Sequence, residues 1–313
     1  MLKAAVADSD RDQVVIVDLE KESPFAIALQ KGDEPGRIVE GRAGRLHVAL
    51  RGAGAVKSVV GIGRSRANLE DALSLGICDE ITRDPLEGVR GADMVFISVP
   101  VCSIPSVVAE IAPALAPGCI VTDGGSVKSA IVRECEPLMP AGCHFVGGHP
   151  IAGTEHSGAA ASFATLYNGK RCILTPTERT DSAALELVAR VWRLTGADVC
   201  IMEPGHHDRI FAEISHLPHA VAYALVHAVG TADVEGENVL SYTAGGFRDF
   251  TRIASSDPAM WRDIALMNRE ALLKSIDGFS SSLAELRQRI DRGDADGLNE
   301  FFTIAKRFRD GII

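Results

Sequence analysis

The sequence predicts an α/β protein in which a doubly wound parallel sheet is followed by an all-α domain. From residue 56 to about residue 176, short β-rich apolar runs alternate with segments of helical pattern. This alternation implies parallel strands joined by right-handed crossovers. After residue 181 the pattern is almost entirely helical. A chain of 313 residues exceeds one typical domain, so we expect two, residues 1–178 and 179–313.

Strands and helices take turns along the first domain. Short apolar runs predict strands at 56–63, 92–101 and 119–123, and within 144–150 and 170–176. The segments between them predict helices at 66–76, 105–115 and 129–139. This order is that of a Rossmann-like dinucleotide-binding domain. An earlier apolar run, QVVIVDLE at 13–20, is a further candidate strand.

The second domain contains one unusually apolar segment. Within residues 206–230 the sequence becomes almost wholly apolar from Leu217 onward. A helix that is apolar on all sides is buried on all sides, either in a large core or against another subunit. We therefore expect the helical domain to form a homodimer.

Composition narrows the classes of partner. Hydrophobic residues make up 46% of the chain and charged residues 24%, as in soluble globular proteins. The net charge is −10 and there is no long Lys/Arg block, which argues against nucleic acid and anionic membranes as partners. No signal peptide is evident and no apolar run is long enough to span a bilayer. The seven cysteines are scattered without a CxxC pair, so we expect reduced thiols and a cytoplasmic protein.

The stretch FVGGHPIAGTEHSG (145–158) places one histidine among residues that shape the backbone. Gly147 and Gly148 allow close approaches that a side chain would block, and Pro150 stiffens the turn. Rigid loops on α/β scaffolds often contain catalytic groups, and histidine titrates near neutral pH. His149 is therefore a candidate catalytic residue, although a lone histidine is more often a solvated or satisfied side chain.

The stretch DGGSVKS (123–129) lies at the carboxyl end of a predicted strand, where open α/β sheets bind ligands. Asp123 and Ser126 are therefore candidates for contact with a cofactor or substrate. The alternative is a plain strand-to-helix turn in which Ser126 caps the next helix.

The stretch HHDRIFAEISHLPH (206–219) places His216 and His219 on one helical face. One alternative is a metal site that combines these two with His206, His207 or Asp208. We expect no metal, because no second cluster of ligands has a recognised metal spacing.

Two further stretches contain arginines that suit anionic ligands. Arg248 and Arg252, in GGFRDFTRIASSDPAMWRDI, have the planar fork that binds a carboxylate, with surface ion pairs as the alternative. The turn Arg64–Arg66 follows a predicted strand at the position where NAD-binding folds usually have Asp or Glu. Arg64, Ser65 and Arg66 suit a 2′-phosphate better, which favours NADP over NAD.

These motifs together resemble the prephenate/arogenate dehydrogenase family of tyrosine biosynthesis. The resemblance rests on DGGSVKS, FVGGHPIAGTEHSG, LYNGKRCILTPT, SHLPHAVAYAL and GGFRDFTRIASSDPAMWRDI, and covers about residues 56 to 280 in the right order. It implies a cytoplasmic, dimeric enzyme that oxidatively decarboxylates prephenate with NAD or NADP. An arogenate or dual-specific cyclohexadienyl dehydrogenase is the alternative within the family.

The resemblance also implies roles for individual residues. His149 would accept a hydrogen bond and then the proton of the ring 4-hydroxyl, while Ser126 would help to place that hydroxyl and the nicotinamide. Arg252 would bind a substrate carboxylate. The remaining expected substrate contacts are His216, His219, Thr154, Glu155 and Arg248. The expected cofactor contacts are Gly41, Gly44, Arg64, Ser65, Arg66, Val99, Pro100, Asp123 and Ser126.

Two of these expectations stay open. Glu155, next to His149, either tunes that histidine, gates the pocket or faces the ammonium group of arogenate. The phosphate-binding GxGxxG loop has no clean copy, because only Gly41 and Gly44 occupy fingerprint positions. Either residues 1–46 contain a reading-frame slip or the N-terminus has diverged. A catalytically weak ligand-binding protein with a defective nucleotide loop is the alternative from another class.

Overall fold

The computed structural model describes residues 13–18, 58–152 and 166–312. Its main sheet has six strands in the order β3-β2-β1-β4-β5-β6, the order of a dinucleotide-binding fold. A second sheet has the order β7-β8-β9. The strands are β1 Gln13–Asp18, β2 Ser58–Gly63, β3 Glu80–Thr82, β4 Met94–Ser98, β5 Ile120–Asp123, β6 His144–Val146, β7 Gly148–Pro150, β8 Arg171–Leu174 and β9 Asp198–Ile201.

The main sheet is covered on both faces, as the doubly wound prediction requires. Successive residues of β4 alternate between two cores: Met94 and Phe96 join one, and Val95 and Ile97 join the other. Helices α2 and α6 contribute to the first core, and α4 and α5 to the second. The helices of this part are α2 Arg66–Ser74, α3 Pro85–Gly88, α4 Ile104–Ile111, α5 Ser129–Cys135 and α6 Ser182–Leu194, with short 3-10 turns η1 Val101–Ser103, η2 Ala112–Ala114 and η3 Glu136–Leu138.

Strand β1 departs from the prediction of an all-parallel sheet. It lies between β2 and β4 but runs antiparallel to both, with Gln13 opposite Gly63 and Ser98. A central strand can satisfy its N–H and C=O groups in either direction, and antiparallel pairing is slightly more stable per residue. The chain therefore leaves β1 at Asp18, on the edge opposite the carboxyl ends of the neighbouring strands.

Near residue 179 the sequence pattern changes from alternating strands and helices to helices alone. The packing changes only later in the chain. Helix α6 packs Ala184, Val188 and Trp192 into the core of the first domain. Strand β9 then pairs with β8 in the second sheet. The packing therefore favours a domain boundary after β9, later than the expected boundary at 178.

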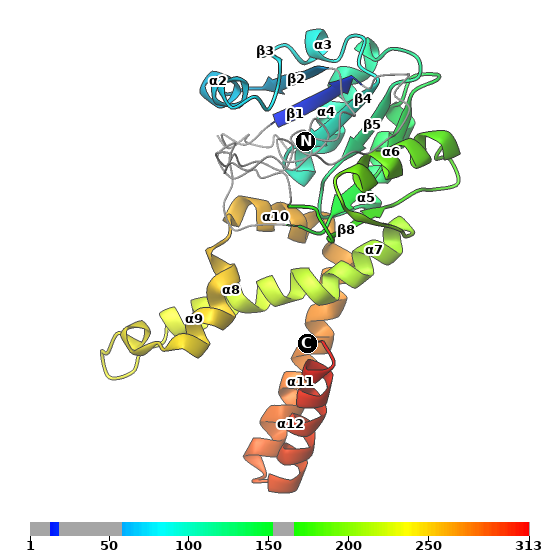
Figure 1. Cartoon of the computed structure of the whole chain (residues 1–313). Coiled ribbons are helices and arrows are strands. Elements are labelled where there is room, and N and C mark those ends of the chain that lie inside the picture. The colour runs from blue at the N-terminus through cyan, green and yellow to red at the C-terminus, as the bar shows by residue number, and fades with distance from the viewer. Residues whose placement is uncertain (1–12, 19–57, 153–165, 313) are drawn as a thin grey trace, which may run out of the picture.

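The helical part projects away from the main sheet as two arms (Figure 1). One arm contains α8 and α9, and the other is the hairpin of α11 and α12. The elements are α7 Pro204–Phe211, the π-helical turn η5 Ala212–His216, α8 Leu217–Gly230, η6 Val239–Tyr242, α9 Gly245–Thr251, η7 Arg252–Ser255, α10 Pro258–Met267, α11 Arg269–Asp291 and α12 Ala295–Asp310. Only Ala222 of α8 is buried in the single chain. Burial in the core of its own chain, the first of the two explanations for this apolar helix, is therefore wrong for this structure.

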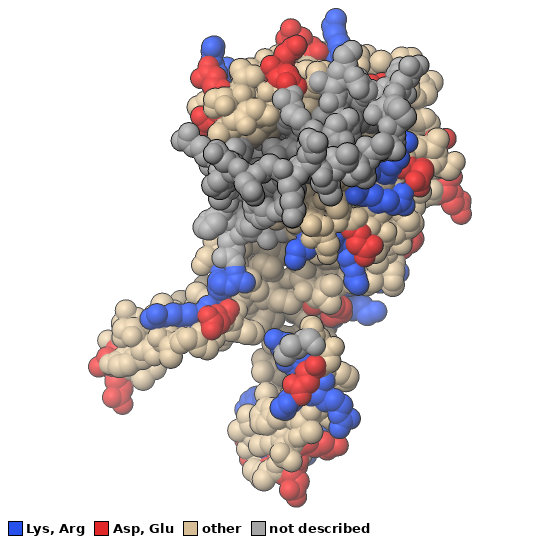
Figure 2. Space-filling model, viewed as in Figure 1, with Lys and Arg blue, Asp and Glu red and all other residues tan. Residues whose placement is uncertain are grey.

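The described surface combines both signs of charge. Figure 2 shows Lys and Arg interspersed with Asp and Glu over the face it presents. Large apolar side chains are exposed on the arms, among them Leu283, Phe302 and Phe308. Within the described ranges, no helix combines the length and the hydropathy that crossing a bilayer requires.

Candidate active site

His149 lies on the short strand β7 and directly follows two glycines that its packing requires. A Cβ on Gly147 would lie 2.6 Å from Thr175 Oγ1, and one on Gly148 would lie 2.8 Å from the Asp123 carbonyl oxygen. Both contacts are closer than a side chain permits. The Gly-Gly pair thus lets β7 pack directly against the end of β5. The prediction of a tightly packed histidine loop is confirmed, since His149 is only 7% exposed.

A buried ion pair fixes this end of β5. Lys128 and Asp123 are both 0% exposed and paired, and Lys128 Nζ also donates to the Gly148 carbonyl oxygen at 2.7 Å. Asp123 accepts two further hydrogen bonds, from the backbone N–H of Gly125 and of Gly148. The Asp123 carboxylate is thus bonded within this turn, and its contact with a cofactor stays a prediction.

Behind His149 lies a chain of three buried polar side chains. His149 Nδ1 is 2.8 Å from His207 Nε2, and His207 Nδ1 is 2.8 Å from Asp208 Oδ1. Asp208 also accepts hydrogen bonds from the backbone N–H of Lys128 and Ser129. Phe211 packs against both imidazole rings. Residues of β7 and α7, far apart in sequence, therefore form one connected network.

The charge states follow from burial and partners. Burial lowers the pKa of His207, although the Asp208 carboxylate opposes this. Burial by itself would raise the pKa of Asp208, but the hydrogen bonds from His207, Lys128 and Ser129 outweigh it and the pKa is lowered. Asp208 is thus ionised and His207 neutral near pH 7.

The order of donors then fixes the tautomer of His149. A carboxylate only accepts, so His207 donates from Nδ1 and keeps a lone pair on Nε2. His149 must therefore donate from Nδ1 to that lone pair. In the neutral ring the lone pair is then on Nε2, the form needed to accept a proton.

Ser126 does not cap the following helix. Helix α5 begins at Ser129 with Lys128 at its N-cap, and no side chain makes a cap hydrogen bond there. Ser126 is half-buried, and its backbone faces the ring of His216. The capping alternative is thereby wrong, and Ser126 lies beside a second histidine.

His216 and His219 lie on one side of the η5–α8 helix, as the sequence predicts. His219 stacks on Trp261 of α10 with ring centroids 3.6 Å apart, and His216 meets the edge of the same indole. Burial lowers the pKa of His216 to about 4 and also lowers that of His219. Both rings are therefore neutral near pH 7.

Several predicted residues lie elsewhere or outside the described chain. Arg248 on α9 and Arg252 at the start of η7 are exposed, and α9 lies along the outer part of α8, away from the main sheet (Figure 1). This chain alone does not place Arg248 next to His149. The predicted residues Gly41, Gly44, Thr154 and Glu155 lie outside the described residues.

The expected cofactor turn has local partners of its own. Ser65 caps α2 by accepting from the backbone N–H of Asn68, and Arg66 pairs with Glu70 at 2.7 Å. Val99 and Pro100 follow β4 directly, and Val99 belongs to a hydrophobic core. All of these residues follow strands that run in the direction of β5, so they lie at its carboxyl edge.

The sequence missed four residues as parts of this site: Lys128, His207, Asp208 and Asn268. His207 and Asp208 entered only as components of a metal alternative, yet they bond to each other and to His149. In the part of the chain that the structure describes, no group of three His, Cys, Asp or Glu residues is arranged to hold a metal ion. In the sequence, the one available signal for this pair was that His207 and Asp208 are adjacent in the stretch HHDR.

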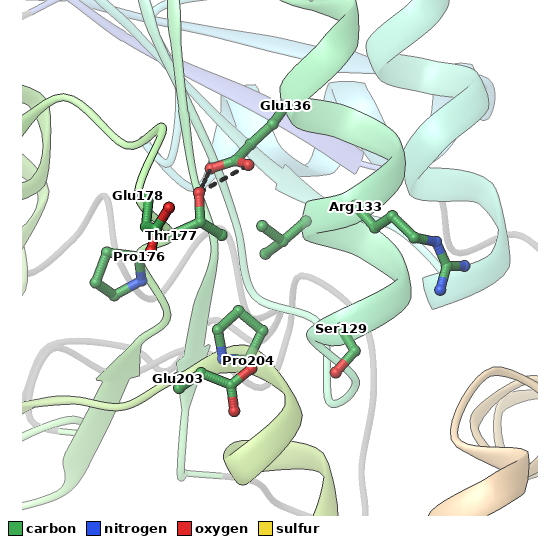
Figure 3. A pocket seen from close by; sticks show the side chains of 9 residues that line it. Ser129, Arg133, Glu136, Pro176, Thr177, Glu178, Glu203 and Pro204 are labelled. Atoms are coloured by element: carbon green, nitrogen blue, oxygen red, sulfur yellow. Dashed lines mark hydrogen bonds between the residues drawn. The ribbon is translucent and has the colours of Figure 1, made fainter.

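A shallow depression of about 670 Å³ lies next to Ser129 (Figure 3), whose backbone N–H donates to Asp208. It is lined by α5, the segment after β8 and the start of α7, including Ser129, Arg133 and Glu203. Glu136 lies at its rim and accepts hydrogen bonds from Thr177 and Thr180. None of the histidines described above lines this depression, so it is separate from their cluster.

Comparison with known families gives the same division of the chain. The sequence model of the prephenate dehydrogenase nucleotide-binding domain matches residues 46–201, and that of the prephenate dehydrogenase dimerization domain matches residues 203–304. The chain belongs to the prephenate dehydrogenase family. The first match begins at residue 46, after Gly41 and Gly44, and the two matches meet where the packing changes.

Individual relatives of this family agree. Prephenate dehydrogenase of Bacillus subtilis is 36% identical over 270 residues, covering 86% of this chain and 73% of the relative. Cyclohexadienyl dehydrogenase of Zymomonas mobilis is 39% identical over 239 residues, covering 76% of this chain and 80% of the relative. The crystal structure of prephenate dehydrogenase from Aquifex aeolicus with hydroxyphenyl propionate and NAD+ is 41% identical, with a TM-score of 0.82, covering 86% of this chain and 94% of that one.

Proposed function

We propose that this protein catalyses the NAD(P)-dependent oxidative decarboxylation of prephenate to 4-hydroxyphenylpyruvate, a step of tyrosine biosynthesis. One observation carries the proposal: the Asp208–His207 pair accepts a hydrogen bond from His149 Nδ1, so that the neutral form of His149 has its lone pair on Nε2. That group suits removal of the proton from the 4-hydroxyl of the substrate ring. Membership of the family supports the choice of substrate.

The bond changes require little from the protein. The carbon that bears the 4-hydroxyl loses hydride, the hydroxyl proton passes to His149 Nε2, and the ring carboxylate leaves as CO2 while the ring becomes an aromatic phenolate. His149 then returns the proton to the phenolate oxygen, which gives 4-hydroxyphenylpyruvate and restores the neutral imidazole. A nicotinamide cofactor supplies the hydride acceptor when bound. The chain's own residues align the hydroxyl, through His149 and Ser126, and exclude water from the buried histidines.

The fold fits such a cofactor at one edge. The order of strands and the shared carboxyl edge of β2, β4 and β5 are those of a dinucleotide site. The candidate glycines Gly41 and Gly44 lie outside the described residues. At the end of β2, Gly63 to Arg66 contain no acidic residue, which favours the 2′-phosphate of NADP.

The decisive test is the initial rate of nicotinamide reduction by purified protein, with prephenate and arogenate each paired with NAD and NADP. We expect turnover of prephenate, with the higher kcat/KM for NADP. Absence of turnover in all four combinations, from folded protein that still binds prephenate, would overturn the proposal. It would support instead a ligand-binding protein with a defective nucleotide loop.

A second activity, on arogenate, is favoured by one observation. The relative from Zymomonas mobilis, at 39% identity, is a cyclohexadienyl dehydrogenase. Arogenate has an ammonium group where prephenate has a keto group, so a site for both needs an acidic partner, for which Glu155 is the candidate. A Glu155→Gln variant that loses arogenate turnover and keeps prephenate turnover would identify that partner.

We also propose that the protein is a cytoplasmic homodimer that forms through its helical arms. The half-exposed apolar helix α8 and the exposed Leu283, Phe302 and Phe308 support this interface. Light scattering should give twice the chain mass of 33.2 kDa. A monomeric mass at micromolar concentration would overturn this part of the proposal.

Resequencing the gene over codons 37–54 separates the two accounts of the N-terminus. An altered frame that restores a glycine loop would explain why the family match begins at residue 46. An uninterrupted frame would establish a diverged N-terminus.

A further inference from the structure

A second buried histidine, linked to the same Asp208 as the proposed proton acceptor, has the opposite hydrogen-bond role. His216 is 1% exposed, and its Nδ1 lies 3.0 Å from the side-chain nitrogen Nδ2 of Asn268. The same nitrogen lies 2.8 Å from the carbonyl oxygen of Asp208. A carbonyl only accepts, so the amide nitrogen of Asn268, and not its oxygen, must face Asp208.

The tautomer of His216 follows from this orientation. The amide nitrogen has two hydrogens: one goes to the Asp208 carbonyl and the other to His216 Nδ1. His216 Nδ1 is therefore the lone-pair nitrogen, and the neutral ring has its hydrogen on Nε2. Nε2 is buried and makes no hydrogen bond of normal geometry within the described ranges, although the backbone of Ser126 faces this ring. A buried donor without a well-placed acceptor is costly, so a ligand oxygen bound beside Ser126 would stabilise it.

We propose that Asp208 sets the two site histidines as opposite neutral tautomers, His149 as an acceptor through His207 and His216 as a donor through Asn268. The side chain of Asp208 determines the first and its backbone carbonyl determines the second. Asn268 and His207 are then positioning residues for the reaction. This inference rests on the proposed function for its chemistry, though the tautomers are a property of the folded protein alone.

Asp208 is well fixed for this double role. Its carboxylate accepts from two consecutive backbone N–H groups, Lys128 at 2.8 Å and Ser129 at 2.9 Å. Lys128 is itself buried and bonded to Asp123 and Gly148. The anchor of both histidines is therefore the rigid turn between β5 and α5, which also bears Ser126.

The break between α10 and α11 brings Asn268 to this point. Asn268 has φ −106° and ψ 34°, outside helical values, and separates the two helices. Its side chain can thus reach sideways to α7 and η5 rather than project from a continuous helix. A site with one acceptor and one donor suits a substrate that offers a hydroxyl hydrogen and a carboxylate or hydroxyl oxygen.

The tautomers can be measured without turnover. In protein labelled with 15N-histidine, long-range 1H–15N spectra near pH 7 distinguish Nδ1–H from Nε2–H rings. The two signals are assigned by their loss in His149→Asn and His216→Gln. We expect His149 as Nδ1–H and His216 as Nε2–H. Either ring in the other form in folded protein would overturn the inference, whatever the activity.

Variants separate positioning from folding. Asn268→Leu keeps the side-chain size but removes the donor, so the His216 signal should lose its pure Nε2–H form while His149 stays unchanged. The KM for prephenate should rise about tenfold, the loss of one hydrogen bond, with kcat little changed. The matched control is Asn238→Leu at the exposed cap of η6, which should change neither. An Asn268→Leu protein with native His216 signal and KM would contradict the role of Asn268.

His207→Phe tests the hydrogen bonds that orient His149. The phenyl ring at position 207 should still pack on Phe211, but the His149 signal should show an Nε2–H population. The kcat should fall about tenfold or more, with the KM for prephenate nearly unchanged. His206→Phe, one residue away on the exposed side of α7, is the control. If both histidines show the expected tautomers but the protein does not oxidise prephenate, the proposed function is wrong and this inference still holds.

Discussion

The two halves of the proposed site are built in contrasting ways. The proton-handling cluster, which we define as His149, His207, Asp208, His216 and Asn268, is buried and bonded throughout. The cofactor turn, residues 64–66, lies on the surface, where the side chain of Arg66 is 79% exposed. Buried hydrogen bonds fix charge and tautomer, whereas exposed ion pairs contribute about 0–1 kcal/mol. We therefore expect the proton-handling cluster to determine the chemistry. Substitutions in the cofactor turn should change the preference for NAD or NADP with little loss of stability.

The largest expected effect comes from the proton acceptor. His149→Asn should lower kcat by about 10²- to 10⁴-fold, the range for a general base, while the KM for prephenate changes little. His144→Asn is the matched control, because His144 lies on the neighbouring strand β6 outside the cluster. Near-normal turnover of His149→Asn in a steady-state assay would mean that another group accepts the proton.

The ion pair beneath the cluster should matter most for stability. Lys128→Met leaves the carboxylate of Asp123 buried without its cation, which should lower the free energy of unfolding by about 3–5 kcal/mol. Lys306→Met removes an exposed pair with Asp310 and should cost only about 0.3–0.5 kcal/mol. Urea unfolding at one fixed protein concentration compares the two. Equal costs would show that burial does not distinguish these pairs.

The buried His216 predicts a pH dependence of stability. Its folded pKa of about 4 lies below the ordinary value of 6.5, so the unfolded chain takes up the proton first. Its stabilisation is complete above pH 6.5 and is lost as the pH falls toward 4, by about 3 kcal/mol. His216→Gln should therefore lose about that much less stability than the wild type between these pH values. Parallel curves for the two proteins would show that His216 is not protonated on unfolding.

The smallest effect is expected at the cofactor turn. Replacing Arg64 and Arg66 together by Ala should raise the KM for NADP about tenfold, equivalent to about 1.4 kcal/mol, and leave that for NAD nearly unchanged. Arg133→Ala, at an exposed ion pair on α5, is the control. If both cofactors lose affinity equally, the turn does not read the 2′-phosphate.

The sequence predicted the regular elements of the first domain well because their patterns are local. The runs at 58–63 and 94–98 form β2 and β4, and the segment at 66–74 forms α2. It missed β9, which lies between two helices in a region of helical pattern. The almost entirely helical pattern after residue 181 also gave no sign of the break at Asn268 between α10 and α11. Short strands and single-residue breaks depend on pairing and side-chain contacts that no local period records.

By itself, the sequence determined the doubly wound architecture, the helical second part and the family, and it placed His149 on a tight glycine loop. Those conclusions depend on composition, periodicity and motif spacing, which the chain contains locally. Only the tertiary structure decided that His207 and Asp208 serve His149, that Asn268 faces His216, and that β1 runs antiparallel. These depend on which backbone and side-chain groups meet after folding, such as Lys128 and Asp208, which are 80 residues apart in sequence. Donors far apart in the chain must find acceptors once water is excluded.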